Sequence, residues 1–214
     1  IRNIFSIEDL RVRILNTIGF LIIFRLGSFI VLPGVDPNVL GAGAQGGIFD
    51  LLNTFLGGSF SRASIFALGI MPYISASIVV QLLTLAVPYF QKLQKEGDSG
   101  RKRLNQITRV LTIFITGFQS YGYIRGTIDP AAIIDPGFFF YFSSITILIA
   151  GTMFCMWLGE RITNKGIGNG ISMLIMIGIV SRFPGAIIDE AVNNRGMQGA
   201  LLFLVEVLVL FFVV

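Results

Sequence analysis

The chain has 214 residues, of which 54% are hydrophobic and only 13% are charged, with a formal net charge of +4 at pH 7. A typical soluble domain carries about 25% charged residues, so this deficit and the long apolar runs exclude an ordinary soluble domain and indicate a membrane protein of several spans. The absence of histidine excludes His-based catalysis and His metal sites, and the single cysteine, Cys155, excludes an internal disulfide. We expect no enzyme activity, no metal and no cofactor.

The sequence predicts an all-α, polytopic membrane helix bundle. The first apolar segment runs from about Ile14 to Leu32 and ends at Pro33-Gly34, and a Gly-rich stretch over 34–47 follows. The next segment, Ile48–Leu56, is amphipathic. At about 1.5 Å per residue it is too short to cross about 30 Å of hydrocarbon, so we expect a short helix folded back into the protein.

Four more full spans and the start of another follow this short segment. They are predicted over Ala63 to about Tyr89, Ile107 to about Ile124, Phe138 to Leu158, Ile171 to about Ile188, and from about Gly199 onward. The chain begins at Ile1 and its last apolar run, 201–214, looks cut short, so we expect a longer protein.

The positive charges indicate the orientation of these spans. With the N-terminus inside, eleven of the 16 Lys and Arg residues lie on the inner side and four on the outer, which predicts a cytoplasmic N-terminus. The eleven are Arg2, Arg11, Arg13, Lys92, Lys95, Arg101, Lys102, Arg103, Arg109, Arg161 and Lys165.

The basic segment over 91–109 has two interpretations. A positive cytoplasmic loop commonly does no more than fix topology and face lipid headgroups. It is also suited to docking an anionic partner such as ribosomal RNA, because basic clusters bind phosphate backbones without sequence choice.

Three glycines, Gly166-x-Gly168-x-Gly170, resemble a nucleotide-binding motif only superficially. The dinucleotide fingerprint needs G-x-G-x-x-G after a strand, and neither the spacing nor the context fits. These glycines more plausibly allow a sharp turn or a close approach between two backbones.

Arg25 is predicted near the centre of the first span, where an ionisable group indicates a functional site by default. The alternative is a structural pairing with an acidic group or a carbonyl in a part of the protein that this sequence does not include. Apart from Glu206 in the last segment, few acidic groups are predicted at mid-depth, which argues against ion-coupled transport.

Two pairs of isoleucines one helical turn apart, Ile70/Ile74 and Ile171/Ile175, each lie beside helix-disturbing residues. On the second span Ser77 and Gln81 continue the same face. This pattern fits a dry constriction above a polar funnel, and it equally fits an ordinary interface between helices.

Long blocks of sequence around these pairs resemble one known family. They are 24–29 with 33–36, 61–78, 95–101, and 157–163 with 166–172. In order and spacing they are similar to the SecY family, the channel-forming subunits of the bacterial protein translocase. The resemblance implies the first half of a ten-helix inverted-repeat channel, with residues 1–190 holding transmembrane helices 1–5 and residues 199–214 beginning the sixth.

The resemblance also implies functional residues. The mid-membrane aliphatic pore ring corresponds to Ile70, Ile74, Ile171 and Ile175. The plug that closes the resting channel corresponds to about 48–57, with Ile48, Phe49, Leu51, Leu52, Phe55 and Leu56. Ser75 and Gln119 are the candidates for polar contacts of the lateral gate, through which signal sequences enter lipid. The cytoplasmic partner loop corresponds to Lys92, Lys95, Arg101, Lys102 and Arg103.

The function so implied is translocation of unfolded secretory proteins and lateral release of membrane proteins into the bilayer of the bacterial plasma membrane. Its implied partners are the single-span subunits SecE and SecG, and the motor ATPase SecA or a ribosome on the cytoplasmic side. A secondary transporter with interrupted helices, and a structural subunit without a pore, remain alternatives.

Overall fold

The computed structural model describes residues 8–40 and 48–188, without the side chains of 48–50 and 186–188. Within these ranges all regular elements are helical, apart from two isolated β-bridges, and the predicted all-α fold is confirmed. The elements are α1 (Glu8–Gly27), α2 (Ile48–Phe55), α3 (Met71–Ala86), α4 (Pro88–Lys95), α5 (Asp98–Thr127), the 3-10 turn η2 (Pro130–Ala132), α6 (Phe138–Lys165) and α7 (Gly170–Ile188).

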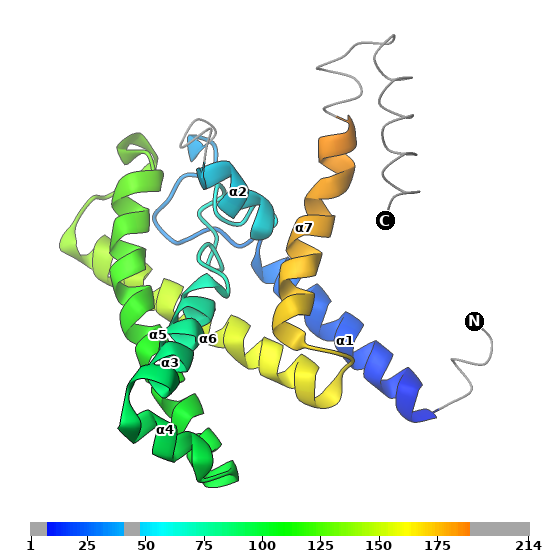
Figure 1. The fold of residues 1–214 in the computed structure, drawn as a ribbon. Coiled ribbons are helices and arrows are strands. Elements are labelled where there is room, and N and C mark those ends of the chain that lie inside the picture. Colours follow the sequence, from blue (N-terminus) through cyan, green and yellow to red (C-terminus); the bar gives the residue numbers. More distant parts are fainter. Residues whose placement is uncertain (1–7, 41–47, 189–214) are drawn as a thin grey trace.

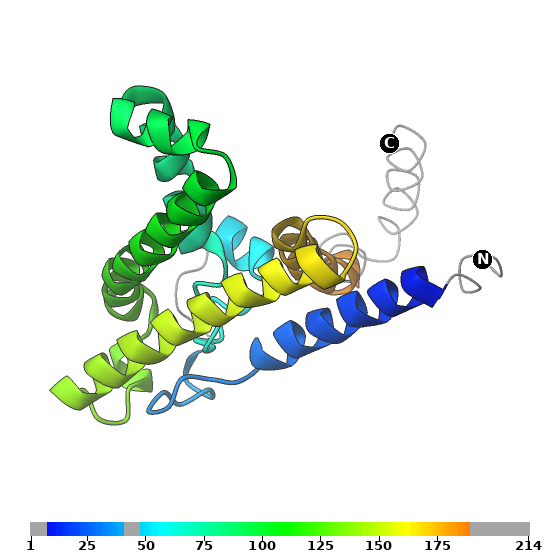
Figure 2. The same ribbon diagram turned by 90° about the horizontal axis from the view of Figure 1, so that it is seen from below.

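The long helix α6 crosses the molecule, and α1, α3, α5 and α7 pack on it (Figure 1). Seen from below, α1 runs beside α6 on one side, and α3, α5 and α7 stand on the other side (Figure 2). Helices α3 and α5 form one column that ends in α4, and α7 forms a second column. The short α2 lies between the upper parts of the two columns and packs on α7.

The second predicted span is not one continuous helix. Residues 61–70 form turns, α3 begins only at Met71, and α4 leaves α3 at an angle of 99°. Gly69 has a positive φ of 51°, and Pro72 lies in the first turn of α3, where a missing backbone N–H costs nothing. Pro88 forces the preceding Val87 into an extended conformation, which ends α3.

The basic segment over 91–109 is also not the loop that the sequence predicts. It is a helical hairpin formed by α4 and the start of α5, with the turn at Gly97, whose φ is 72°. Leu93 is buried in this hairpin, and Gly100 lies against the Leu93 carbonyl. A residue with a Cβ at position 100 would force the two helices apart.

By length and composition alone, one helix of the described residues could cross a membrane, α6, and the bent pair α3–α4 passes the same test when taken together. The sequence predicts five complete spans. Helix α1 has a charged first turn, the first third of α5 is polar and basic, and α7 is apolar only over Gly170–Gly185. The predicted sixth segment lies outside the described residues.

Small polar side chains line the interface between α5 and α6. On α5 the residues Thr108, Thr112, Thr116 and Ser120 recur every four positions and are buried. The three threonine hydroxyls donate to the carbonyls four residues earlier, so they satisfy their polar atoms within their own helix. Small residues at such positions allow two helices to pack closely without water.

The irregular segment 61–70 makes one close backbone contact with α6. A Cβ added at Gly151 would fall on the carbonyl oxygen of Ile65, whereas a Cβ at Gly117 of α5 meets nothing nearer than Ile149 Cδ1 at 3.9 Å. We therefore expect Gly151→Ala to destabilise the protein by about 1–3 kcal/mol through overpacking.

Thermal unfolding in detergent measures this effect. Gly117→Ala is the control, and it should leave the midpoint unchanged or raise it, because alanine favours a helix by up to about 1 kcal/mol over glycine. Equal midpoints for the two variants would contradict the predicted contact.

Candidate functional site

The four predicted ring isoleucines lie together in one apolar cluster between α3, α6 and α7. The same cluster contains buried Phe24, Phe66, Cys155, Leu158 and Leu174. Gly159 of α6 is the point where the helices meet, because a Cβ there would come within 3.3 Å of Ile171 Cγ1 and 3.6 Å of Ile70 Cδ1. Ile70 is only 4% exposed, and Ile74, Ile171 and Ile175 are partly exposed.

Local sequence positions both pairs at the start of a helix. Ile70 is the N-cap of α3, and its carbonyl accepts a hydrogen bond from the N–H of Ile74 at 3.1 Å. At α7 the Asn169 side chain accepts from the N–H of Ile171 at 3.0 Å, as a capping residue does. The start of each helix is therefore fixed, and with it the direction of its isoleucines.

The glycine run before α7 permits this arrangement. Gly168 has a positive φ of 72°, and a Cβ at Gly170 would fall on the carbonyl oxygen of Gly159. The N–H of Gly170 donates to Thr163 Oγ1 at 2.9 Å. The structure thus supports both roles inferred for these glycines, a sharp turn and a close backbone approach.

Helix α2 lies against the isoleucine cluster. A small cavity of about 150 Å³ separates them and is lined by Phe55 and Leu56 at the end of α2, by Ile70 and Ile175, and by Phe24, Met71 and Leu174. Gly178 of α7 makes the approach possible, because a Cβ there would fall on the Phe55 carbonyl. The predicted plug and ring residues therefore share one apolar cavity.

The side chains of α2 differ in burial. Leu56 is only 6% exposed, Leu52 is partly buried, and Leu51 and Phe55 are exposed at 61% and 42%. The side chains of Ile48 and Phe49 lie outside the described part. One end of α2 is thus held firmly, and much of its described apolar surface has no cover from this chain.

Two arginines hold the end of α2. Arg25 Nη1 and Arg62 Nη2 both donate to the Gly57 carbonyl oxygen at 3.0 Å, and both guanidinium groups lie 4.7 Å from the centre of the Phe29 ring. Arg25 lies in the last turn of α1 and not near the middle of a span. Of the two alternatives for Arg25, the structure supports a structural pairing with a carbonyl, but that carbonyl belongs to Gly57 of this chain and not, as predicted, to a part outside it.

A second and larger cavity, of about 520 Å³, lies between α2, α3 and α5. Its wall includes both candidate gate residues, Ser75 and Gln119, together with Leu52 and Leu56 of α2. Ser75 is exposed and donates to the Met71 carbonyl of its own helix at 3.2 Å, and Gln119 is exposed. The two residues therefore line one cavity, but the hydrogen bond of Ser75 stays within α3 and does not connect α3 to another helix.

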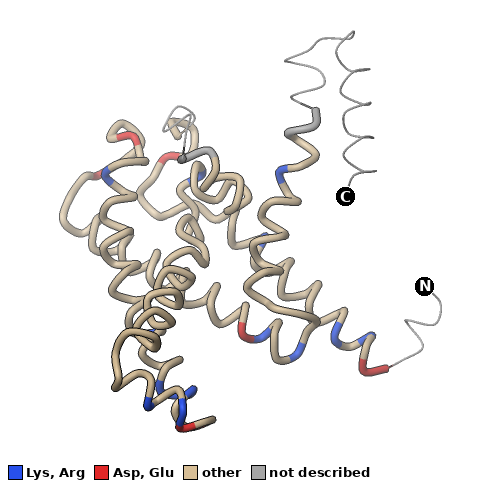
Figure 3. The backbone as a smooth tube through the Cα atoms, in the orientation of Figure 1, with Lys and Arg blue, Asp and Glu red and all other residues tan. Residues whose placement is uncertain are grey.

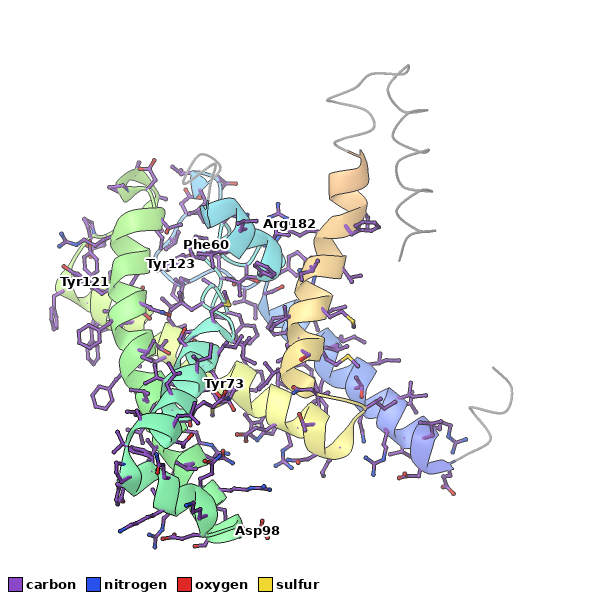
Figure 4. The ribbon with its side chains drawn as sticks, viewed as in Figure 1. Phe60, Tyr73, Asp98, Tyr121, Tyr123 and Arg182 are labelled. Carbon is purple, nitrogen blue, oxygen red and sulfur yellow. The ribbon has the colours of Figure 1, made fainter. Side chains whose placement is uncertain are left out.

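Tyr123 of α5 lines this larger cavity and is itself buried. Its hydroxyl donates to the Phe60 carbonyl at 2.6 Å, and the two rings pack edge to face with centroids 4.8 Å apart (Figure 4). The sequence gives no indication of this pair, because neither residue belongs to a recognisable motif. Arg62 was likewise missed as a partner of the α2 end.

Two polar residues of α3, Ser77 and Gln81, bond to each other. Gln81 Nε2 donates to Ser77 Oγ at 3.3 Å along the helix, and Gln81 is exposed. The partner-loop residues Lys92, Lys95, Arg101, Lys102 and Arg103 are all exposed on the α4–α5 hairpin. Positive charges gather there, at the end of α6 and at the start of α1, along one edge of the molecule (Figure 3).

One ion pair connects α5 and α6 near this basic edge. Arg109 Nη2 of α5 lies 2.8 Å and 2.7 Å from the two carboxylate oxygens of Glu160 on α6. Within the described residues no group of three or more acidic or cysteine side chains could hold a metal ion. The cavities beside the isoleucines and the gate candidates are lined mainly by apolar side chains.

These features define a class of protein: a helical membrane bundle whose central apolar cluster is covered by a short helix that cannot span. The comparisons agree with this class. The SecY family model matches residues 64–214. The chain is 50% identical over 211 residues to the SecY protein translocase subunit of Escherichia coli K12, covering 95% of this chain and 47% of that protein.

Other relatives agree. Identity is 48% over 215 residues to the SecY subunit of Buchnera aphidicola from Schizaphis graminum, covering 97% of this chain and 49% of that protein. It is 44% over 199 residues to that of Aquifex aeolicus, covering 88% and 46%. The chain belongs to the SecY family, and it spans about half the length of the curated relatives it matches.

Solved structures share the fold. Sec61 in the canine ribosome-channel complex from the endoplasmic reticulum superposes with a TM-score of 0.61 at 19% identity, over 92% of this chain and 42% of that one. A structure described as that of a protein conducting channel gives a TM-score of 0.60 at 19% identity, over 92% and 41%. The chain therefore has the fold of the first half of such a channel. As a member of the SecY family of bacterial translocase subunits, it is a multi-pass protein of the bacterial inner membrane.

The Arg25 contact yields a prediction about α2. We expect Arg25→Gln in the full-length protein to loosen α2, because the Gly57 carbonyl loses a charge-assisted hydrogen bond worth about 1.5–3 kcal/mol. Protease or thiol-reagent access to a cysteine placed at Leu51 should increase several-fold. Arg125→Gln, at an exposed arginine of α5, is the matched control, and equal access in both variants would contradict the anchoring role.

Proposed function

We propose that this chain forms the N-terminal half of a protein-conducting channel. In the complete protein, unfolded secretory polypeptides would pass the isoleucine cluster, and signal sequences and membrane segments would leave sideways into the bilayer. The observation that carries the proposal is the position of α2. Phe55 and Leu56 at its end line the same small apolar cavity as Ile70 and Ile175.

The chemistry of the isoleucines suits a pore ring. A translocating chain presents a different side chain at every step, so a site with specific polar contacts would trap it. Ile70, Ile74, Ile171 and Ile175 offer weak contacts that do not depend on sequence, and an apolar constriction closes to ions by excluding water.

The geometry of α2 suits a mobile plug. Eight residues span about 12 Å, so the helix can leave its seat without rearranging a membrane span. Gly57 and Gly58 have φ angles of 62° and 83° and form the connection at its end. The exposed Leu51 and Phe55 indicate that α2 gains only part of its possible burial from this half of the channel.

The larger cavity suits one side of a lateral gate. It separates α2 from α3 and α5, and Ser75 and Gln119 are available on its wall for polar contacts. Such contacts between membrane helices are worth roughly 0.6–2 kcal/mol each, which is weak enough for an interface that opens.

The charge distribution supports a cytoplasmic N-terminus and a cytoplasmic docking edge. The basic ends of α1, α4–α5 and α6 lie along one edge, as the positive-inside rule requires for one side of a membrane (Figure 3). We assign SecA or a ribosome to this edge, with Lys92, Lys95, Arg101, Lys102 and Arg103 as contacts, and SecE and SecG as membrane partners. The comparisons do not favour the alternative of a secondary transporter.

A crosslinking experiment tests the path of the polypeptide. With a photo-crosslinking residue at Ile74 of the full-length protein and a stalled secretory precursor, we expect an adduct to the precursor, because Ile74 belongs to the proposed ring. The matched control is Val79, which lies about 140° around α3 from Ile74 and is 41% exposed. Absence of an Ile74 adduct, or equal yields at both positions, would refute the pore assignment.

Ion conductance tests the seal. In the full-length protein with α2 deleted, Ile70, Ile74, Ile171 and Ile175 changed together to Ser should raise the resting ion leak well above that of the α2 deletion alone, because hydroxyls wet the constriction. Changing the same four residues to Val keeps the cluster apolar and should add little leak. Thermal unfolding is measured alongside, because Ile70 is buried, and a folded Ser variant with no extra leak would overturn the ring.

A further inference from the structure

Three arginines converge beside the end of α2. Arg25 of α1, Arg62 after α2 and Arg182 of α7 line one open cavity of about 480 Å³. Its other lining residues include Gly57, Ile179 and Phe183, and among the described residues that line it none is acidic. Arg182 lies between α7 and α2 (Figure 4).

The hydrogen-bonding capacity of this cluster exceeds what the described residues use. A guanidinium group has five N–H donors, and Arg25 and Arg62 share one carbonyl acceptor, that of Gly57. Arg62 Nε is buried without a partner in the described structure. The two ion pairs of the described residues, Arg13–Asp9 and Arg109–Glu160, involve none of the three arginines.

Three clustered positive charges favour an anion. Guanidinium groups bind phosphate with fixed, forked geometry, and basic pockets between membrane helices hold anionic lipid headgroups. Bringing a phosphate between Arg25, Arg62 and Arg182 would offset their mutual repulsion and offer acceptors to the unused N–H groups.

The surroundings of the cavity favour a lipid over a small anion. Exposed apolar side chains flank it on both helices: Leu26, Phe29 and Ile30 at the end of α1 and just beyond it, and Val180 and Phe183 on α7. Arg25 lies seventeen residues after Glu8, about 26 Å along α1, and the hydrocarbon core of a bilayer is about 30 Å thick. Arg25 is therefore far from the basic edge, toward the opposite leaflet.

We propose that Arg25, Arg62 and Arg182 form a binding site for the phosphate group of an anionic phospholipid in the outer leaflet, with its acyl chains along α1 and α7. Through Arg25 and Arg62 the bound lipid would contact the same groups that hold the end of α2. The proposal does not depend on the polypeptide path.

Native mass spectrometry of the full-length complex tests the site. After delipidation in detergent, phosphatidylglycerol or phosphatidylcholine is added, and the retained lipids are counted. We expect phosphatidylglycerol to be retained over phosphatidylcholine. Arg182→Gln should weaken that binding about fivefold, the value for about 1 kcal/mol per basic residue near anionic lipid.

Arg182 is the residue to change because it is exposed and does not contact Gly57, so the variant should keep the α2 anchor. Arg125→Gln is the matched control, an exposed arginine of α5 outside the cavity, and it should bind phosphatidylglycerol as the unchanged protein does. Arg182→Lys keeps the charge without the fork and should give intermediate binding.

Three outcomes would overturn the proposal. One is equal phosphatidylglycerol binding by the Arg182→Gln and Arg125→Gln variants. Another is complete displacement of the lipid by inorganic phosphate, which would mean a site for the phosphate group alone. The third is no lipid effect together with a lower thermal midpoint of lipid-free Arg182→Gln, which would mean that a carboxylate of the complete protein fills the site.

Discussion

The structure depends on how residues 57–70 satisfy their backbone polar groups. This segment crosses the interior without forming a helix, and an unpaired N–H or C=O away from water costs several kcal/mol. Its partners are Arg62 within the segment and two other parts of the chain, residues 25–32 and α5. Arg25 and Arg62 donate to the Gly57 carbonyl, and the Tyr123 hydroxyl donates to the Phe60 carbonyl. The Leu32 N–H donates to the Ala63 carbonyl, and the Ile65 N–H of the segment donates to the Ile30 carbonyl at 2.9 Å. The ends of α1 and α5 are therefore tied to this segment, which delivers α2 on one side and α3 on the other.

This way of holding the segment explains why α2 combines a firm end with a loose body. The Gly57 carbonyl has two charged donors, and Leu56 is buried beside it. Beyond that point, the cavity of about 150 Å³ between α2 and the isoleucines removes dispersion contacts that a filled interface would have. This unequal attachment is what the plug role that we propose requires, because a short helix could then tilt while its connection at Gly57 stays in place.

An element could be predicted from the sequence when nearby residues determine its conformation, and not when contacts with distant residues do. The apolar runs of α6 and α7, the amphipathic α2 and the helical spacing of Ile70/Ile74 and Ile171/Ile175 depend on local pattern, and the structure has helices at these positions. The non-helical residues 61–70 could not be predicted, because their apolar composition suits a helix and their actual conformation depends on distant partners. The α4–α5 hairpin was missed because the exposed charges there resemble a loop, although Leu93 and Gly100 pack the two helices together.

Contacts that join distant parts of the chain were the least predictable part of the site. The sequence offered a carbonyl as one partner for Arg25, but nothing in it identifies Gly57 as that carbonyl or Arg62 as a second donor. The resemblance led to the isoleucine cluster and α2, because long motifs carry those residues. It gave no indication of the Tyr123–Phe60 pair, in which two residues lining the larger cavity are joined by a hydrogen bond.

The isoleucines form a wall in this chain and not a closed ring. Ile70 is buried by α6 and its neighbours within the chain, so its position is fixed without other partners. Ile74, Ile171 and Ile175 remain partly exposed, and α2 covers the cluster without filling the space beside it. Because an apolar constriction excludes water only when apolar groups surround it, a seal requires further apolar side chains from the remainder of the protein. In the channel that we propose, this division would also allow the constriction to widen, because two walls can separate without either one unfolding.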